Sequence, residues 1–516
     1  MQLIASGDYC SQEFSSEFGV MPPSFLPVGN CRLFEKQVHV FDSDDLIYLS
    51  LPECFEIELS DSKKLQELGV EIIRVPEGLS IGESISYCIN VTCEHGNIIE
   101  VSYGDTLIEA VDTYQKDLVA VAEIDDNYDW HLVDQKWGSG EGKAIAGFFR
   151  FSNSSELVKA ITHSSGDFIA ALYIYSSEYK QLETYESNVW LDFGHVHTYF
   201  RSKATITTQR VFNEMEITTT YVEKKSFKSG KIKAEIQWYN SIPASITQYT
   251  PRLLSEFSNN DLCGYRLEYL YLSSLSELCV FGSLPVFVWD KIFSACEEFL
   301  DDCRALPAKD FNRQVVMQMY TEKTKIRMLE YLQCNELDVN APWVINGEVF
   351  PTLNELINIT DKLISVSDGS GVSLIHGDFC FSNILYDFRT QRVKVIDPRG
   401  VDVNGECTIY GDRRYDVAKL THSMLGSYDY IVAGKYFMEQ HSPTNFSFNI
   451  LDSRSESARL SFMKKKFAGV DVASKENIAI TIQLFISMLP LHNDCVDRQK
   501  AFLCNSFRLY KMLEEL

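Results

Sequence analysis

Two aspartates and an asparagine in the last third of the 516-residue chain have the types and spacing that phosphoryl transfer needs. Asp378 follows the short apolar run 372–375, Asn383 lies five positions later, and Asp397 ends the apolar run 393–396. We expect both runs to be strands, joined through a loop and a short hairpin. A carboxylate can orient or deprotonate an acceptor hydroxyl, and carboxylate and amide oxygens bind the Mg²⁺ that bridges nucleotide phosphates. Asp378 suits the first task, and Asn383 and Asp397 suit the second.

The stretch from residue 372 to residue 400 also matches the motifs of a known family. His376, Asp378 and Asn383 have the His-x-Asp-x4-Asn spacing of a kinase catalytic loop. With the Ile-Asp end of the following strand, this stretch resembles the aminoglycoside phosphotransferase and choline kinase family, which has the wider protein-kinase-like fold. The resemblance implies that Asp378 is the catalytic base, that Asn383 and Asp397 are magnesium ligands, and that ATP is the phosphoryl donor.

Two further features lie downstream of this loop. The segment 411–419 resembles the Tyr-Asp-x-Ala-Lys stretch of the same family, in which the aspartate braces the catalytic loop. The resemblance implies that role for Asp416, and an ordinary acidic residue at a helix N-terminus is the alternative. Asp397 is followed by Pro-Arg-Gly instead of the Phe-Gly of protein kinases. Arg399 in this tripeptide suits either contact with a phosphate or anionic acceptor, or a structural salt bridge.

A lysine upstream is expected to contact the nucleotide phosphates. The run 221–225 has the composition of a strand, and Lys224 lies on the same face of it as Val222. Lys224 is the better candidate, and Lys225 is the near alternative. Glu235 lies on a predicted helix after the next turn, where it can pair with that lysine. A solvated surface charge is the alternative for each of these residues, and no glycine-rich hairpin precedes Lys224.

The elements around these residues predict three regions. Residues 1–205 read as short apolar strands alternating with amphipathic helices, which favours an α/β domain with a mainly parallel, Rossmann-type sheet. Residues 206–285 correspond to the N-lobe of an α+β, protein-kinase-like, two-lobed domain. Residues 286–516 correspond to its helical C-lobe, which contains the catalytic loop. At the start of the C-lobe an apolar stripe predicts a helix: Val288, Ile292, Cys296, Phe299 and Cys303.

The N-terminal region carries a second resemblance. The run 22–29 (PPSFLPVG) resembles the Pro-Lys-x-Leu-x-Pro-Val run of sugar-1-phosphate nucleotidyltransferases, and the segment 103–106 resembles their strand-end Gly-Asp. This implies magnesium-binding roles for Asp105 and Asp192. The stretch 6–13 stands where that family has a glycine-rich, arginine-containing phosphate loop, but it is acidic and poor in glycine, which disfavours phosphate binding. We therefore expect the nucleotidyltransferase-like fold with impaired or lost activity, and a role in binding a sugar nucleotide or positioning the acceptor.

Composition limits the partners. The formal net charge of −25 disfavours binding to nucleic acid or to anionic membranes. The 14 cysteines contain no CxxC pair, which is typical of free thiols in a reducing cytoplasm. The sequence shows neither a signal peptide nor an 18-residue apolar run, so we expect a cytoplasmic protein without a membrane span.

The whole arrangement resembles two-domain proteins of bacterial capsule and surface-polysaccharide biosynthesis. It predicts an ATP- and Mg²⁺-dependent kinase that phosphorylates a hydroxyl of a sugar or related small metabolite. One alternative is a bifunctional enzyme that combines kinase and sugar-phosphate nucleotidyltransferase activities. Another is a non-catalytic, pseudokinase-type scaffold, which the presence of Asp378, Asn383, Asp397 and a candidate lysine disfavours.

Overall fold

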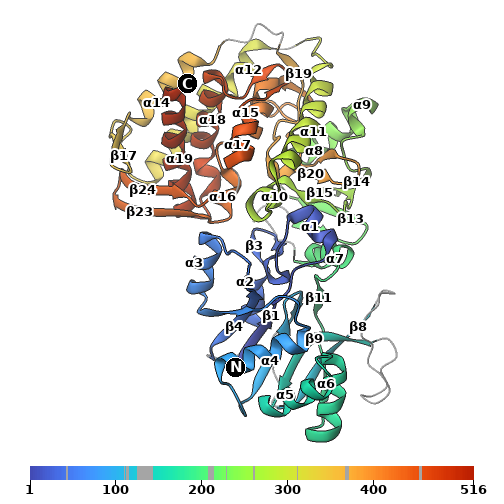
Figure 1. Cartoon of the computed structure of the whole chain (residues 1–516). Coiled ribbons are helices and arrows are strands. Elements are labelled where there is room, and N and C mark those ends of the chain that lie inside the picture. Colours follow the sequence, from blue (N-terminus) through green and yellow to red (C-terminus); the bar gives the residue numbers. More distant parts are fainter. Residues whose placement is uncertain are drawn as a thin grey trace. The chain divides into compact units, whose positions relative to one another are not determined.

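The computed structural model describes most of the chain and divides it into two compact units, Met1–Ile206 and Thr207–Leu516 (Figure 1). The described residues are 1–41, 45–109, 111, 115–124, 143–206, 214–227, 229–259, 262–310, 312–365, 371–452 and 456–516. None of the helices in these ranges is long and apolar enough to cross a membrane.

Met1–Ile206 is built around a seven-stranded sheet with the order β10-β8-β9-β6-β1-β4-β5. All neighbouring strands are parallel except the two pairs that β9 makes with β6 and β8. The mainly parallel sheet expected from the apolar runs is therefore confirmed. Its strands are β1 (Gln2–Ala5), β4 (Ile47–Pro52), β5 (Val70–Val75), β6 (Ile99–Tyr103), β8 (Leu118–Glu123), β9 (Lys143–Phe151) and β10 (Glu183–Glu186).

Three helices cover one face of this sheet: α4 (Ile81–Thr92), α5 (Ser154–His163) and α6 (Phe168–Ile174) (Figure 1). Their apolar side chains share one buried core with alternate residues of the strands, as Leu157 of α5 and Phe149 of β9 illustrate. The remaining elements of this unit are α1 (Gln12–Phe18), α2 (Phe34–Gln37), α3 (Leu59–Glu67), α7 (Val196–Thr205), β2 (Pro27–Val28), β3 (Cys31–Arg32), β7 (Thr106–Ile108) and β11 (Trp190–Asp192).

Thr207–Leu516 begins with a four-stranded antiparallel sheet in the order β12-β13-β15-β14. Strands β12 (Glu214–Ile217) and β13 (Tyr221–Ser226) form an antiparallel hairpin, and β14 (Leu253–Asn259) and β15 (Leu262–Glu268) complete the sheet. Helix α8 (Ser229–Ser241) packs against β15, and its Ile232 and Trp238 are buried. A short helix, α9 (Ala244–Thr247), follows.

The rest of this unit is mainly helical, and the predicted apolar stripe lies on α11 (Val286–Arg304), where Ile292, Cys296, Phe299 and Cys303 are buried. Helix α18 (Lys475–Met488) is buried along almost its whole length, so it forms the centre of the helical packing. The other helices are α10 (Leu275–Phe281), α12 (Arg313–Gln318), α13 (Thr321–Cys334), α14 (Leu353–Leu363), α15 (Arg413–Met424), α16 (Tyr428–Val432), α17 (Glu456–Phe462) and α19 (Val496–Glu515).

The expectation of a helical region from residue 286 onward was incomplete, because this region also contains a sheet in the order β18-β17-β24-β23. Alternate burial in β24, where Phe446 and Phe448 point inward, gives the period of two that marks a half-buried strand. The strands are β17 (Trp343–Ile345), β18 (Glu348–Phe350), β23 (Tyr436–Ser442) and β24 (Asn445–Ile450). Short strands elsewhere are β16 (Ser273–Ser274), β19 (Val372–Leu374), β20 (Ile384–Asp387), β21 (Arg392–Val395), β22 (Tyr410–Asp412), β25 (Lys466–Phe467) and β26 (Val470–Asp471).

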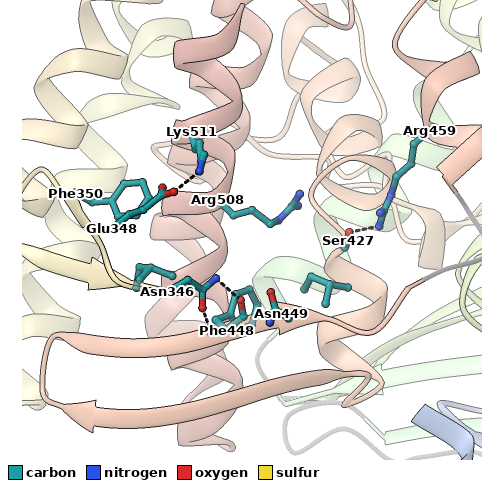
Figure 2. Close-up of a pocket in the computed structure, with 11 residues that line it drawn as sticks. Asn346, Glu348, Phe350, Ser427, Phe448, Asn449, Arg459, Arg508 and Lys511 are labelled. Atoms are coloured by element: carbon teal, nitrogen blue, oxygen red, sulfur yellow. Dashed lines mark hydrogen bonds and ion pairs between the residues drawn. The ribbon is translucent and has the colours of Figure 1, made fainter. Parts of the chain in front are cut away.

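A cavity of about 320 Å³ lies beside this sheet and helix α19 (Figure 2). Lys511 on α19 pairs with Glu348 on β18, and Arg459 on α17 pairs with Asp452 at 2.6 Å. The residues that line this cavity include none of the site residues predicted from the sequence.

Candidate active site

The loop after β19 brings Asp378 and Asn383 into contact. The Asn383 Nδ2 donates hydrogen bonds to the main-chain oxygen of Asp378 at 3.0 Å and to its Oδ2 at 3.1 Å. Strands β20 and β21 pair as the predicted hairpin, and the amide of Ile396 donates to the Asn383 main-chain oxygen at 3.0 Å. This bond puts Asp397, the next residue, beside Asn383, so the three predicted residues meet at the base of one hairpin.

Asp397 is tied to the four-stranded sheet through Lys224. The Lys224 Nζ lies 3.2 Å from Asp397 Oδ1 and donates to the two Glu235 carboxylate oxygens at 3.0 and 2.9 Å. The hydroxyl of Tyr265 donates to the same Glu235 carboxylate at 2.7 Å. Burial lowers the pKa of Lys224, but the carboxylates of Asp397 and Glu235 outweigh burial and raise that pKa above its usual value. Lys224 is therefore a fixed cation that faces the hairpin.

The neighbouring lysine has a different position. Lys225 lies 3.4 Å from Glu223, whose carboxylate also accepts a hydrogen bond from Arg266. Successive residues of a strand point to opposite faces, which explains why one lysine faces Asp397 and the next does not. Of the two candidates, Lys224 is the one that the structure places with Glu235 and Asp397.

A buried carboxylate holds the backbone of the loop. Asp416, in the first turn of α15, accepts hydrogen bonds from the amides of His376 at 2.7 Å and Gly377 at 2.8 Å. Burial raises the pKa of Asp416 to about 7, while these two hydrogen bonds act in the opposite direction. The His376 ring is buried, which lowers its pKa to about 4, and its Nε2 lies 3.0 Å from the main-chain oxygen of Ile396. Both contacts fix the conformation of the residues that lead into Asp378.

Lys419 is the partner of Asp378 that sequence reasoning missed. Its Nζ lies 2.8 Å from Asp378 Oδ1, and the Asp378 side chain remains 40 % exposed. Partial burial raises the pKa of Asp378, but Lys419 outweighs it and holds that pKa well below its usual range. Lys419 lies one helical turn after Asp416, so the same motif could have indicated that both side chains face the loop. Asp378 is thus ionised at neutral pH and accessible to a hydroxyl group.

The oxygen donors at the hairpin base fit Mg²⁺. Asn383 and Asp397 offer an amide oxygen and a carboxylate, which are ligands that this cation prefers, and Mg²⁺ usually takes its remaining ligands from water and nucleotide phosphates. Asn383 uses its Nδ2 for Asp378, so its carbonyl oxygen is the atom left for a cation. Across the described ranges, no group of three or more His, Cys, Asp or Glu residues is positioned to hold a metal ion.

In Met1–Ile206 the two predicted aspartates also lie together. A Cβ atom on Gly194 would lie 2.7 Å from Asp105 Oδ2 and 3.4 Å from Asp192 Oδ1, so the two carboxylates flank this glycine. Burial raises the pKa of Asp105, and burial together with Asp105 raises the pKa of Asp192 to about 7. Asp192 also accepts a hydrogen bond from the Thr198 hydroxyl. The arrangement is a partly buried carboxylate pair, with Asp105 just after β6 and Asp192 at the end of β11.

No protein-family model and no curated protein matches the sequence. Among solved structures, the chain is similar to a thermostable mutant of the aminoglycoside phosphotransferase APH(4)-Ia in a ternary complex with ADP and hygromycin B. The two share 11% identity over 62% of this chain and 98% of that chain, with a TM-score of 0.37. It is also similar to a Bacillus anthracis protein described as a glucose-1-phosphate thymidylyltransferase, with 15% identity over 40% of this chain and 96% of that one and a TM-score of 0.32. HddC from Yersinia pseudotuberculosis is similar at 14% identity over 40% of this chain and 98% of HddC, with a TM-score of 0.28.

Proposed function

We propose that this protein is an ATP- and Mg²⁺-dependent phosphotransferase that phosphorylates a hydroxyl group of a small molecule, a sugar or related metabolite. The observation that carries the proposal is the convergence of Asp378, Asn383 and Asp397 with Lys224, which Glu235 and Tyr265 hold in place. Phosphoryl transfer depends mainly on positioning and on stabilising charge, and this set of side chains supplies both.

Each residue has a distinct task in this proposal. Lys224 binds the nucleotide phosphates, and Glu235 fixes its ammonium group. Asn383 and Asp397 would hold Mg²⁺, which would neutralise charge on the phosphates. The ion pair between Lys224 and Asp397 in the present structure brings the phosphate-binding residue and a magnesium ligand to the same place.

Asp378 acts on the acceptor. Its ionised carboxylate orients the acceptor hydroxyl and accepts its proton as the oxygen bonds to the γ-phosphorus of ATP. The bond from that phosphorus to the bridging oxygen breaks, ADP leaves, and Asp378 then returns the proton to solvent. Lys419 keeps Asp378 ionised, and Asp416 fixes the backbone on which Asp378 stands.

The proposed function also assigns a role to each region of the chain. We assign residues 206–285 to a kinase-like N-lobe, residues 286–516 to the C-lobe, and residues 1–205 to a nucleotidyltransferase-like domain. A role in capsule or surface-polysaccharide biosynthesis follows from that combination of domains.

A bifunctional enzyme is the second candidate function. The observation that favours it is the proximity of Asp105 and Asp192, because two neighbouring carboxylates can hold a divalent cation. The acidic stretch 6–13 disfavours it. Release of pyrophosphate from a nucleoside triphosphate and a sugar phosphate, dependent on Asp105, would support this activity.

The test is acceptor-dependent consumption of ATP by the full chain, screened over sugars, sugar phosphates and amino alcohols. Asp378→Asn should lower kcat by about 100-fold or more, because proton transfer to a positioned base contributes that much, and ATP binding should change little. Asp338→Asn, which alters an exposed carboxylate, is the control. Equal turnover of Asp378→Asn and the wild type would refute the assignment of Asp378.

A further inference from the structure

Three cationic side chains gather around one buried tyrosine next to the catalytic loop. The Lys323 Nζ and the Arg399 Nη1 each lie 3.2 Å from the Tyr415 hydroxyl oxygen, and both cations also lie over the Tyr415 ring, at 5.2 and 5.6 Å from its centre. Arg327 lies one helical turn after Lys323 on α13, and its Nη1 donates to the main-chain oxygen of Ser487 at 3.0 Å. We refer to Lys323, Arg327, Arg399 and Tyr415 as the Tyr415 cluster.

The cluster has an excess of positive charge. Within the described part of the chain, no carboxylate lies within 4 Å of the charged nitrogens of Lys323, Arg327 or Arg399. Burial lowers the pKa of Lys323 to about 8, and Arg399 acts in the same direction. Burial raises the pKa of Tyr415, but Lys323 and Arg399 outweigh it and lower that pKa to about 7. Charges that are withdrawn from water are normally paired with an opposite charge. The cations of this cluster are therefore suited to bind an anion.

Two other partly buried arginines of the same unit, Arg414 and Arg459, form ion pairs. Arg414, which also lies over a tyrosine ring, contacts both Asp412 and Glu476, the latter at 2.7 Å. Arg459 at the cavity of Figure 2 pairs with Asp452. Because the chain has a net charge of −25, carboxylates are plentiful, and the lack of an ion pair to the cations of the Tyr415 cluster in the described residues distinguishes it from these two sites.

The hydroxyl of Tyr415 can also form a hydrogen bond to a ligand. A phenol oxygen can accept two hydrogen bonds and donate one. Lys323 and Arg399 are both donors and occupy its two acceptor positions. An anion beside the surrounding cations favours the protonated form of Tyr415 over the phenolate, and the hydroxyl then donates its proton to that anion.

The cluster adjoins the loop that carries Asp378. The amide of Arg399 donates to the main-chain oxygen of His376 at 2.9 Å, and a Cβ atom on Gly377 would lie 2.7 Å from the Cβ of Arg399. Tyr415 directly precedes Asp416, which binds the amides of His376 and Gly377. A ligand group held by the cluster would therefore lie beside the proposed catalytic base.

We propose that the Tyr415 cluster binds a phosphate group of the acceptor, so that the acceptor is a phosphorylated small molecule with a free hydroxyl, such as a sugar phosphate. This inference rests on the proposed function, because it specifies the substrate class of the same active site. A phosphate dianion matches three cations better than a single carboxylate does, and guanidinium groups bind phosphate oxygens through two parallel hydrogen bonds.

The first test is binding of inorganic phosphate to the nucleotide-free full chain, measured by calorimetry. Lys323→Met and Arg399→Gln should each weaken binding by about tenfold or more, because each removes a charge-assisted hydrogen bond. Lys224→Met, which alters the proposed nucleotide site, should leave this binding unchanged. The thermal unfolding midpoint of each variant serves as the folding control.

Two results of this measurement would overturn the inference. One is the absence of phosphate binding by the wild type at millimolar concentration. The other is binding that is lost in Lys224→Met but retained in both Lys323→Met and Arg399→Gln, since the anion would then occupy the nucleotide site.

The second test compares acceptors in matched sets: a neutral sugar, its phosphate ester and its uronic acid. The phosphate ester should have the highest kcat/KM, and Lys323→Met should raise its KM by about tenfold while the KM for ATP stays unchanged. Preference for the neutral sugar or the uronic acid, with dependence on Asp378 retained, would overturn the phosphate assignment and leave the proposed function intact. If no acceptor is consumed in a way that depends on Asp378, the proposed function fails, and with it the inference.

Discussion

Both units of this chain bring two aspartates close together, but they compensate the charges in opposite ways. In Thr207–Leu516, Asp378 pairs with Lys419 and Asp397 pairs with Lys224. In Met1–Ile206, Asp105 and Asp192 flank a glycine, and burial raises the pKa of both.

This difference separates two kinds of carboxylate site. A carboxylate beside a lysine stays ionised without any ligand, so Asp378 is charged before a substrate arrives. A partly buried carboxylate pair without a lysine partner holds a proton more tightly, although His195 counteracts burial at Asp105, and a divalent cation is the alternative means of neutralising the pair. The comparison predicts that the first site responds to removal of its lysines and the second to pH and to metal ions.

Of the variants that test this comparison, Lys419→Met should have the largest effect. Removal of the cation beside Asp378 should raise the pKa of this carboxylate by about one to three units, because an opposite charge at hydrogen-bonding distance has an effect of that size. Since the ionised form is the active one, the acid limb of the kcat/KM profile should move to higher pH by the same amount, and activity at a pH on that limb should fall by about tenfold or more. Activity at neutral pH, where the carboxylate stays ionised in both proteins, should change little. A pH–rate profile measures this shift.

Lys464→Met, at an exposed position, provides the control for Lys419→Met. If the acid limb of the Lys419→Met profile coincides with that of the wild type, Lys419 does not control the ionisation of Asp378.

A smaller effect is expected from Asp192→Asn on the stability of Met1–Ile206. The folded unit raises the pKa of Asp192 from its usual 3.8 to about 7, so the folded state binds the proton more tightly than the unfolded chain does. The free energy of unfolding therefore falls as pH rises between these values, and an uncharged asparagine avoids that loss. Above a pH of about 7, Asp192→Asn should be more stable than the wild type by about 1 kcal/mol.

Thermal unfolding at several pH values measures this effect, with the exposed Asp8→Asn as the control. The stabilisation should vanish in mildly acidic buffer, where Asp192 is protonated in the wild type. A gain that is independent of pH would show that charge repulsion is not its cause.

The smallest effect is expected from Lys225→Ala. This side chain contacts Glu223, away from the hairpin base, and it is partly exposed, so its loss should change kcat/KM for ATP by less than about twofold. Lys224→Met should lower the same quantity much more. An equal loss of kcat/KM for ATP in the two variants would contradict the assignment of Lys224, and not Lys225, as the lysine that binds the nucleotide.

The sequence predicted the parts of this molecule that depend on local pattern. The apolar runs were sufficient to predict strands β4, β5, β6, β8 and β9, and the apolar stripe was sufficient to predict helix α11, because burial imposes a regular period on strands and helices. The spacing of Asp378, Asn383 and Asp397 was informative for a related reason, since a hairpin brings together residues that lie close in sequence. The sheet of β17, β18, β23 and β24 was missed, because its short strands come from two distant segments.

The Tyr415 cluster could not be predicted in this way. Lys323 lies on α13, Arg399 in the loop after β21, and Tyr415 on α15, so no local spacing relates them. Each looks like an ordinary surface charge or core aromatic in the sequence, and only the tertiary packing reveals the shared hydroxyl contact. The net charge at a site depends on all residues that the fold brings close to it, and a motif in the sequence does not contain that information.

The most direct test of the central claim is the affinity for Mn²⁺, as a spectroscopic substitute for Mg²⁺, in the presence of a non-hydrolysable ATP analogue. Electron paramagnetic resonance measures the free ion for the wild type and for Asn383→Ala, Asp397→Asn and Asp378→Asn. If Asn383 and Asp397 are the metal ligands and Asp378 is the base, the first two variants should weaken Mn²⁺ binding by about tenfold or more, and Asp378→Asn should change it little. Unchanged affinity in both Asn383→Ala and Asp397→Asn would contradict the account.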